Sequence, residues 1–194
     1  MSSRPKTFNA FAKTLHWIMA IGICIAWLAV EYRHSFTTSG SAESALALDI
    51  HMLAGWCIAL LILPRLFWRF TQIPPPPVGS KAERAIAKVS HWSLYGLMLV
   101  MPATGYLGTG RDTRVFDWFT IPQFQNTPAF EWLVTSRLAM SFEDWEKPVD
   151  FLHKDIGGTW ALPCLFLLHA GAALFHHFVK RDDVLLRMLP GKQT

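Results

Sequence analysis

The fold follows from residues 156–179, which read IGGTWALPCLFLLHAGAALFHHFV and contain no Asp, Glu, Lys or Arg. An α-helix needs about 20 apolar residues to cross the hydrocarbon core of a bilayer, so this run predicts a transmembrane helix. Charge-free runs also occupy residues 14–30 and 89–110. A fourth run, at 50–64, continues past Arg65 if that side chain extends its guanidinium to the lipid headgroups.

The composition favours a membrane protein over a soluble or disordered one. The 194-residue chain is 52% hydrophobic and only 16% charged, whereas soluble domains carry about a quarter charged residues. Its net charge of +4 does not indicate a nucleic-acid-binding face, because Lys and Arg stand in short clusters between apolar runs. We therefore expect one all-α domain over residues 1–194, an integral membrane four-helix bundle with helices at about 11–32, 48–70, 88–110 and 153–179.

Basic residues are distributed unequally between the two sides of this bundle. The N-terminal arm, the second connection and the C-terminal tail carry 12 Lys and Arg, and the first and third connections carry 6. The positive-inside rule therefore predicts that both termini are cytoplasmic. With 3 acidic residues inside and 11 outside, the two faces differ by +9 against −5.

The cysteines and the long third connection are less specific features. Cys24, Cys57 and Cys164 all lie in predicted spans, which indicates small buried hydrophobic residues rather than a disulfide framework or a zinc site. The third connection, residues 111–150, combines Trp residues with many acids. We expect it to form an interfacial layer over the mouth of the bundle, with a short helix or two.

The histidines are the most informative residues, because a polar ring within the hydrocarbon region is costly unless it is paired or bound. Six of the eight sort by their depth in the predicted spans. His51 and His153 stand near the outer ends of the second and fourth helices. The inner set comprises His16, His91, His169 and His176. Of the other two, we expect His34 at the surface and His177 at the interface.

Two layers of histidines favour haem over other metal centres. Zinc needs three or four ligands at one point, and the spans lack the carboxylates of a di-iron site. A haem needs only two axial ligands, which facing helices of a bundle can supply. Two b-type haems stacked across the bilayer would use four histidines, and the absence of a Cys-x-x-Cys-His motif excludes c-type attachment.

Helical phase makes one demand on this interpretation. At about 100° per residue, His153 and His169 would differ by about 160° around a straight helix. Gly157, Gly158 and Pro163 lie between them and permit an irregular start or a kink. His176 falls on the same face as His169, either as a rival ligand or as a polar contact at a second site.

The order and spacing of these motifs resemble the bacterial cytochrome b561 family, the four-helix, two-haem membrane proteins that include superoxide oxidase. The resemblance covers nearly the whole chain, and its most distinctive part is the tail at residues 183–190. The matching pieces are Leu15-His16-Trp17, Ile50-His51-Met52 with Gly55, Pro64-Arg65-Leu66, Trp68-Arg69, Ser90-His91, Pro102 with Gly105, His153, Leu168-His169-Ala170, Phe175-His176-His177-Phe178 and Asp183-Val184-Leu185-Leu186-Arg187-Met188-Leu189-Pro190.

The resemblance implies a role for each of six histidines. His16 and His169 would ligate the iron of an inner haem b, and His51 and His153 that of an outer haem b. A ubiquinone site on the cytoplasmic side would be lined by His91 and His176, together with the segment 81–88. Imidazole suits such a site because it donates hydrogen bonds and protons near neutral pH.

The resemblance also implies an oxidoreductase of the bacterial inner membrane. Its activity would be that of a superoxide:ubiquinone oxidoreductase, which takes electrons from superoxide on the periplasmic side. One departure concerns the outer face, which is net acidic, whereas positive charge steers an anionic substrate. The basic residues available for a local positive funnel are Arg111, Arg114, Arg137 and Lys154. Another periplasmic electron donor therefore stays open.

Two other functions are compatible with the sequence. The first is a membrane-anchor cytochrome b subunit, a non-enzymatic carrier that relays electrons between a soluble partner enzyme and the quinone pool. The second is a haem-free structural or transport protein whose histidines line a polar path. All three hypotheses place the chain in contact with membrane lipid. The superoxide oxidase and the membrane-anchor hypotheses also require contact with a quinone.

Overall fold

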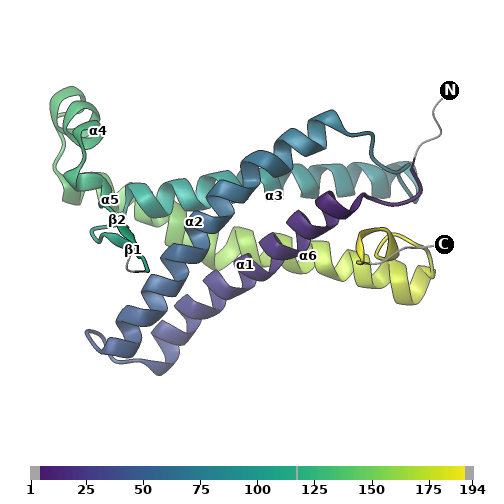
Figure 1. Ribbon diagram of the computed structural model, residues 1–194, viewed down its shortest axis with the longest axis horizontal. Helices are drawn as coiled ribbons and strands as arrows, with labels where there is room; N and C mark the ends of the chain where they lie inside the picture. Colours follow the sequence, from purple (N-terminus) through teal and green to yellow (C-terminus); the bar gives the residue numbers. More distant parts are fainter. Residues whose placement is uncertain (1–4, 117, 191–194) are drawn as a thin grey trace.

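The computed structural model describes residues 5–116 and 118–190, which are mostly helical (Figure 1). It has four long helices, and the last is one continuous rod with segments of different winding. They are α1 (Ala10–Phe36), α2 (Ala42–Thr71), α3 (Lys81–Leu107) and a fourth helix made of α5 (Phe142–Asp150), η3 (Phe151–Ala161), α6 (Leu162–Phe175) and η4 (His176–Lys180). The connection before the fourth helix holds β1 (Thr113–Val115), β2 (Phe119–Ile121), η1 (Phe124–Asn126), α4 (Pro128–Phe130) and η2 (Glu131–Arg137), and η5 (Leu186–Met188) follows η4.

The long helices begin at polar caps rather than where the charge-free runs begin. Asn9, Ser41 and Ser141 each accept a hydrogen bond from a backbone N–H of the first turn. Ser80 and Glu83 form a capping box at the start of α3. Because charged residues are good helix formers outside the bilayer, the fourth helix starts at residue 142 rather than 153.

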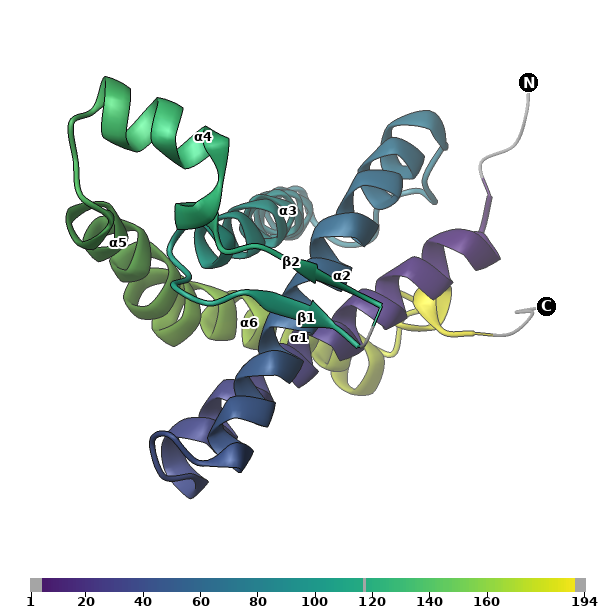
Figure 2. The same cartoon turned by 60° about the vertical axis from the view of Figure 1, so that its left-hand side comes forward.

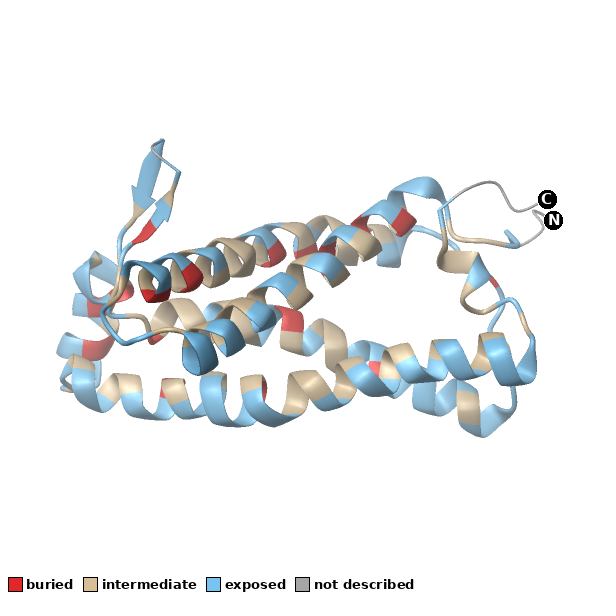
Figure 3. Ribbon diagram, turned by 90° about the horizontal axis from the view of Figure 1, so that it is seen from below, coloured by how far each residue is buried: buried red, intermediate tan, exposed pale blue. Residues whose placement is uncertain are grey.

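Three of the long helices in the described part of the chain are long and apolar enough to cross a membrane: α1, α2 and the fourth helix. The remaining long helix, α3, was also predicted to span the membrane. It has 27 residues and packs between α2 and the fourth helix, but it is less apolar because it carries polar side chains such as Ser90, Ser93 and Thr104. The predicted all-α membrane bundle is confirmed. Most outward-facing residues are exposed in the protein alone, as Figure 3 shows, which suits helices whose outer faces contact lipid.

The closest packing joins α1 to α2, which run side by side in opposite directions (Figures 1 and 2). Met19, Ile58, Ile62 and Met98 form a small core between α1, α2 and α3. Full burial of a side chain of this size stabilises a fold by about 1.5–3 kcal/mol relative to exposure to water. The fourth helix packs mainly on α3.

The expectation that all three cysteines are buried was wrong for two of them. Cys57 and Cys164 are exposed, on helix faces turned away from the bundle, and Cys24 is half-buried. A thiol is weakly polar and behaves as a small hydrophobic group, so a face that contacts lipid accommodates it as readily as a core does.

One end of the bundle, which we name the hairpin end, carries the antiparallel pair β1–β2 and the short helices after it. Phe124, Phe130 and Val134 form a second buried cluster there. The indole of Trp145 donates a hydrogen bond of 3.0 Å to the carbonyl of Leu107, which fixes the cluster to the end of α3. The short helices were expected from the sequence, and the hairpin was not.

At the opposite end, which we name the tail end, the C-terminal segment ties three parts of the chain together. The indole of Trp17 donates to the carbonyl of Met188 at 2.9 Å. The backbone N–H of Phe8 donates to the carbonyl of Arg187, whose guanidinium in turn donates to the carbonyl of Pro76 at 2.6 Å. The start of α1, the second connection and the tail therefore lie at one end of the molecule.

Candidate functional site

Near the hairpin end, His51 of α2 and His153 of η3 face each other with ring centroids 5.9 Å apart. His51 Nδ1 lies 2.8 Å from the carbonyl oxygen of Ala26 in α1, and His153 Nδ1 lies 2.9 Å from that of Met101 in α3. Each of the four long helices thus contributes to this outer pair. The structure brings together the two histidines that the sequence placed at this depth.

These carbonyl contacts define the tautomer of both rings. A carbonyl oxygen only accepts hydrogen bonds, so Nδ1 of each ring carries the proton and Nε2 keeps a free lone pair. A histidine that ligates a metal through one ring nitrogen usually donates the N–H of the other to a carbonyl, which orients the ring. The outer pair is therefore prepared to offer two nitrogen lone pairs to one metal ion.

Glycine provides the space for one of these rings. A Cβ added at Gly105 would lie 2.9 Å from Cε1 of His153, closer than ordinary contacts allow. The hydroxyl of Thr104 lies 3.2 Å from His153 Nδ1 and completes the polar contacts of the ring. Any larger side chain at position 105 would displace the imidazole from α3.

Toward the tail end, His16 of α1 and His169 of α6 lie with ring centroids 6.0 Å apart. His91 of α3 is also close to His169, at 5.3 Å between centroids. The structure therefore brings three histidines of the inner set together, and distance alone does not separate His16 from His91 as the partner of His169. His176 lies outside this group.

The spacing in both pairs fits axial ligation of a haem. An iron–nitrogen bond is about 2 Å and an imidazole centre lies about 1.1 Å beyond its nitrogen, so two axial rings have centres roughly 6 Å apart. The observed centroid distances are 5.9 Å for the outer pair and 6.0 Å for the inner pair. Both pairs of residues fit the group that the sequence predicts.

The winding of the fourth helix removes the phase conflict seen in the sequence. Residues 151–161 form a π-helix, in which the N–H of Leu162 bonds to the carbonyl of Gly157, five residues earlier. Such a helix has about 4.4 residues per turn, or roughly 82° per residue, so the angle between His153 and His169 falls from about 160° to about 16°. Both rings consequently face the interior from one side of the helix.

Arg65 belongs to the inner site, which the sequence analysis missed. Its Nη2 lies 3.1 Å from His16 Nδ1, and its guanidinium carbon lies 5.7 Å from the ring centroid of Tyr95. The expectation that Arg65 extends to the headgroups was wrong, because the side chain is half-buried and directed toward α1 and α3. The signal available in the sequence was the single charge that interrupts the apolar run of α2.

His176 has a different environment at the end of α6. Its Nδ1 lies 2.5 Å from Oδ2 of Asp182, just beyond the left-handed turn at Arg181 that ends the helix. Burial alone would raise the pKa of the Asp182 carboxyl, but the hydrogen bond with His176 and the N–H of Val184 hold that pKa below its usual value. The carboxylate therefore stays ionised at neutral pH and keeps His176 Nδ1 as the protonated nitrogen.

An open groove of about 540 Å³ runs along α3, and its lining does not include His91; the lining residues are Ala85, Lys88, Val89, Trp92 and Ser93. It begins in the basic segment that the sequence assigned to a quinone site. His91 itself is partly exposed. Among residues 5–116 and 118–190 the structure records no direct contact between His91 and His176.

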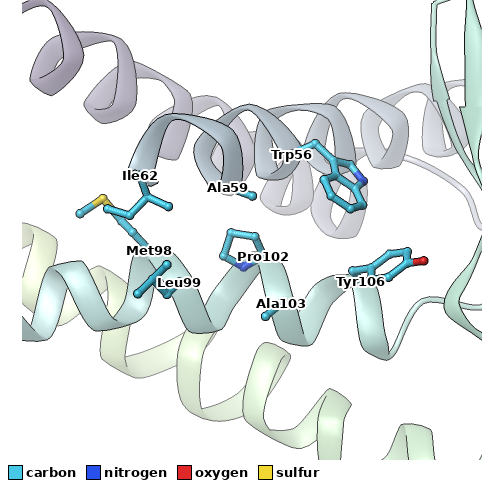
Figure 4. Close-up of a pocket in the computed structure, with 8 residues that line it drawn as sticks. All are labelled: Trp56, Ala59, Ile62, Met98, Leu99, Pro102, Ala103 and Tyr106. Carbon is cyan, nitrogen blue, oxygen red and sulfur yellow. The ribbon is translucent and has the colours of Figure 1, made fainter. Parts of the chain in front are cut away.

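A second cavity, of about 220 Å³, lies between α2 and α3 (Figure 4). Its lining is apolar apart from the edges of Trp56 and Tyr106, whose ring centroids are 5.2 Å apart. None of the histidines lines it, so it is separate from both histidine pairs.

Comparison with known proteins agrees with this geometry. The family model described as prokaryotic cytochrome b561 matches residues 7–191. "Cytochrome b561 homolog 1" of Escherichia coli (strain K12) is 32% identical, over 95% of this chain and 99% of the relative. "Cytochrome b561 homolog 2" of the same organism is 26% identical over 100% and 96%. A protein of Yersinia pestis named "Probable superoxide oxidase CybB" is 27% identical over 97% and 98%.

The family match covers nearly the whole chain, and the family is a helical membrane bundle, as this structure is. The family's members transfer electrons in membranes and bind haem b. The chain belongs to the prokaryotic cytochrome b561 family and is a bacterial membrane electron-transfer protein.

Proposed function

We propose that this protein holds two haems b and carries electrons across the bacterial inner membrane to ubiquinone. The observation that carries the proposal is the pair of histidine couples at two depths, with ring centroids 5.9 and 6.0 Å apart. His51 and His153 would hold the outer haem, and His16 and His169 the inner one. When bound, each haem supplies a one-electron Fe(III)/Fe(II) couple.

The orientation follows from charge. The N-terminal arm, the second connection and the tail carry 12 of the 18 Lys and Arg residues, and hydrogen bonds join these three segments at the tail end. By the positive-inside rule the tail end, with both termini, is cytoplasmic, and the hairpin end faces the periplasm. Electrons would pass from the outer pair to the inner pair and leave at the cytoplasmic side.

The quinone site that we propose uses His176 and His91. The Asp182 carboxylate holds His176 Nδ1, which leaves Nε2 to contact a quinone oxygen and relay a proton. His91 contacts His169, and the groove that includes Lys88 lies along the same helix, so a quinone bound at this level of α3 would be near the inner haem. Reduction of one quinone takes two electrons and two protons and yields the quinol.

We expect His176→Ala to keep both haems and to lower the rate of quinone reduction about a hundredfold, because general-acid groups contribute about that much or more. Asp182→Asn should cost about tenfold, since it removes a partner that only orients the imidazole. The measurement is quinol formation by chemically reduced protein in detergent, with haem content determined on the same sample. His177→Ala is the matched control, because His177 is adjacent and contacts Phe178; a loss of haem in His176→Ala would contradict the assignment.

Superoxide is the electron donor that we propose. Two superoxide anions would each give one electron to the outer site and leave as O₂, and the pair of electrons would reduce one quinone. Support comes from the similarity to the probable superoxide oxidase of Yersinia pestis. Electrostatic steering of superoxide would depend on basic residues that have no acidic partner. Arg111 is paired with Asp49 at 2.8 Å, and Lys154 is paired with Asp150. Of the four basic residues of the proposed funnel, Arg114 and Arg137 have no acidic partner in the described structure.

The donor is tested by stopped-flow mixing of purified oxidised protein with superoxide, followed by haem reduction. The rate should fall steeply between low and high salt if positive charge steers the anion. Superoxide dismutase should abolish the signal. Haem reduction that persists with dismutase, or quinone reduction that needs no superoxide, would rule this donor out.

The alternative function, a membrane-anchor cytochrome b that serves a soluble partner, is favoured by one observation. Phe116 and Trp118 at the tip of the hairpin are 66% and 81% exposed. Large exposed aromatic residues outside the spans suit a docking surface. Co-purification of a periplasmic redox partner that is lost in Trp118→Ser would support this alternative over superoxide oxidation.

A further inference from the structure

Arg65 is a positive charge inside the bundle without a negative partner. In residues 5–116 and 118–190, no carboxylate forms an ion pair with its half-buried guanidinium. Its contacts are the Nδ1 of His16 at 3.1 Å and the face of Tyr95. An arginine within a membrane protein is costly and normally has a partner, so this cation requires an anion that the polypeptide itself does not supply.

The surrounding residues cannot provide that anion. The side chains grouped with Arg65 are His16 from α1, Arg69 from α2, Tyr95 and His91 from α3, and His169 from α6. Each is neutral or positively charged at neutral pH. A group of side chains with this composition attracts an anion.

The hydrogen bond from Arg65 to His16 also conflicts with iron ligation. A guanidinium only donates, so His16 Nδ1 accepts and the proton of the neutral ring resides on Nε2. A ring that ligates through Nε2 must carry its proton on Nδ1, as the outer pair does toward Ala26 and Met101. If His16 ligates iron, its Nδ1 carries a proton and can no longer accept a hydrogen bond from Arg65. The guanidinium must then donate to another acceptor.

We propose that Arg65 binds a propionate carboxylate of the inner haem, an assignment that rests on the two-haem function proposed above. Haem b carries two propionates, which are the anions this pocket lacks. The planar guanidinium donates two parallel hydrogen bonds to a carboxylate, and a partly buried pair of this kind is strong. Release of His16 Nδ1 and capture of the propionate are therefore two consequences of the same event.

The assignment has an electrochemical consequence. A positive charge beside a haem favours the reduced form, which carries one negative charge more than the oxidised form. Arg65 therefore raises the reduction potential of the inner haem above that of an otherwise similar site without it. This shift favours electron transfer toward the inner haem, on the quinone side.

The test is a spectroscopic redox titration of the holoprotein and of three variants. In Arg65→Ala the equilibrium constant for reduction of the inner haem should fall about tenfold, which is about 59 mV for one electron, with the outer haem unchanged. Arg65→Lys should retain the inner haem with a smaller shift, because it keeps the charge but not the paired donors. Lys147→Ala is the control and should shift neither haem, because Lys147 is an exposed cation at the hairpin end, where it is paired with Glu143.

Reconstitution with haem dimethyl ester identifies the acceptor. Esterification removes the negative charge of the propionate and should raise the inner potential, whereas Arg65→Ala should lower it. If Arg65 binds the propionate, Arg65→Ala should lower the potential less in the ester-loaded protein than in the natively loaded protein, because the ester no longer holds the guanidinium beside the haem. Additive effects of esterification and Arg65→Ala on the inner potential would overturn the assignment. So would an inner potential that differs between nanodiscs of anionic and of neutral lipid, since it would show that Arg65 binds a lipid phosphate instead.

The remaining outcomes separate this assignment from the proposed function. A wild-type protein without an inner haem would refute the two-haem function. An inner haem whose potential is the same in the wild type and in Arg65→Ala would overturn the role of Arg65 alone. If Arg65→Ala loses the inner haem, its return in Arg65→Lys supports the assignment, and its loss from both variants overturns it.

Discussion

Replacing His153 with alanine is expected to leave about one haem b per chain where the wild type holds about two. The ring of His153 faces His51 at 5.9 Å, and no other histidine of the described chain contacts either of them. Its Nδ1 is held by the carbonyl of Met101, which orients the ring for ligation through Nε2. We expect His51→Ala to have the same effect.

Haem extraction with quantitation, together with a reduced-minus-oxidised spectrum, measures this loss. The double variant His51→Ala/His153→Ala should match either single variant, because one missing ligand already empties the outer site. His34→Ala, at an exposed position, is the control and should keep both haems. Two haems in His153→Ala would show that the outer pair does not ligate.

Replacing His169 with alanine is expected to remove the inner haem and to reduce electron transfer from the outer donor to quinone to background. His169 contacts both His16 and His91, so each possible inner pair includes it. The outer haem should remain and should still accept electrons. The measurement is the haem spectrum combined with quinol formation after reduction of the outer haem.

Two companion variants determine the partner of His169. We expect His16→Ala to lose the inner haem and His91→Ala to keep it, although the His91 ring is the closer one, at 5.3 Å against 6.0 Å. The reverse result would make His91 the ligand and release His16 for the hydrogen bond with Arg65. Loss of the inner haem in His176→Ala but not in His169→Ala would reverse the ligand choice on the fourth helix.

Much of the site was predictable because it depends on depth along a helix, which residue number alone determines. Counting positions from the ends of charge-free runs placed His51 with His153, and it placed His16 and His169 in an inner set with His91 and His176. The structure brings each of the couples His51–His153 and His16–His169 within about 6 Å. The all-α membrane class followed from the same runs. These inferences need no knowledge of side-chain direction.

The features that were not predictable depend on winding and on side-chain direction. Neither Gly157 nor Gly158 specifies a π-helix, and the wider turn occurs where η3 packs on α3. The direction of Arg65 depends on what α1 and α3 present to it, which an isolated apolar run does not reveal. The start of the fourth helix at residue 142 was missed because a search for uncharged residues passes over a polar helix capped by Ser141.

The π-helical segment also affects how far an electron must tunnel. A π-turn uses more residues than an α-turn for a comparable advance along the axis, so η3 brings His153 closer to the depth of His169 than the same residues would in an α-helix. Tunnelling rates fall exponentially with distance, and a small axial contraction therefore accelerates transfer between the two sites. The same local change of winding that points both imidazoles inward would thus also shorten the gap that the electron crosses.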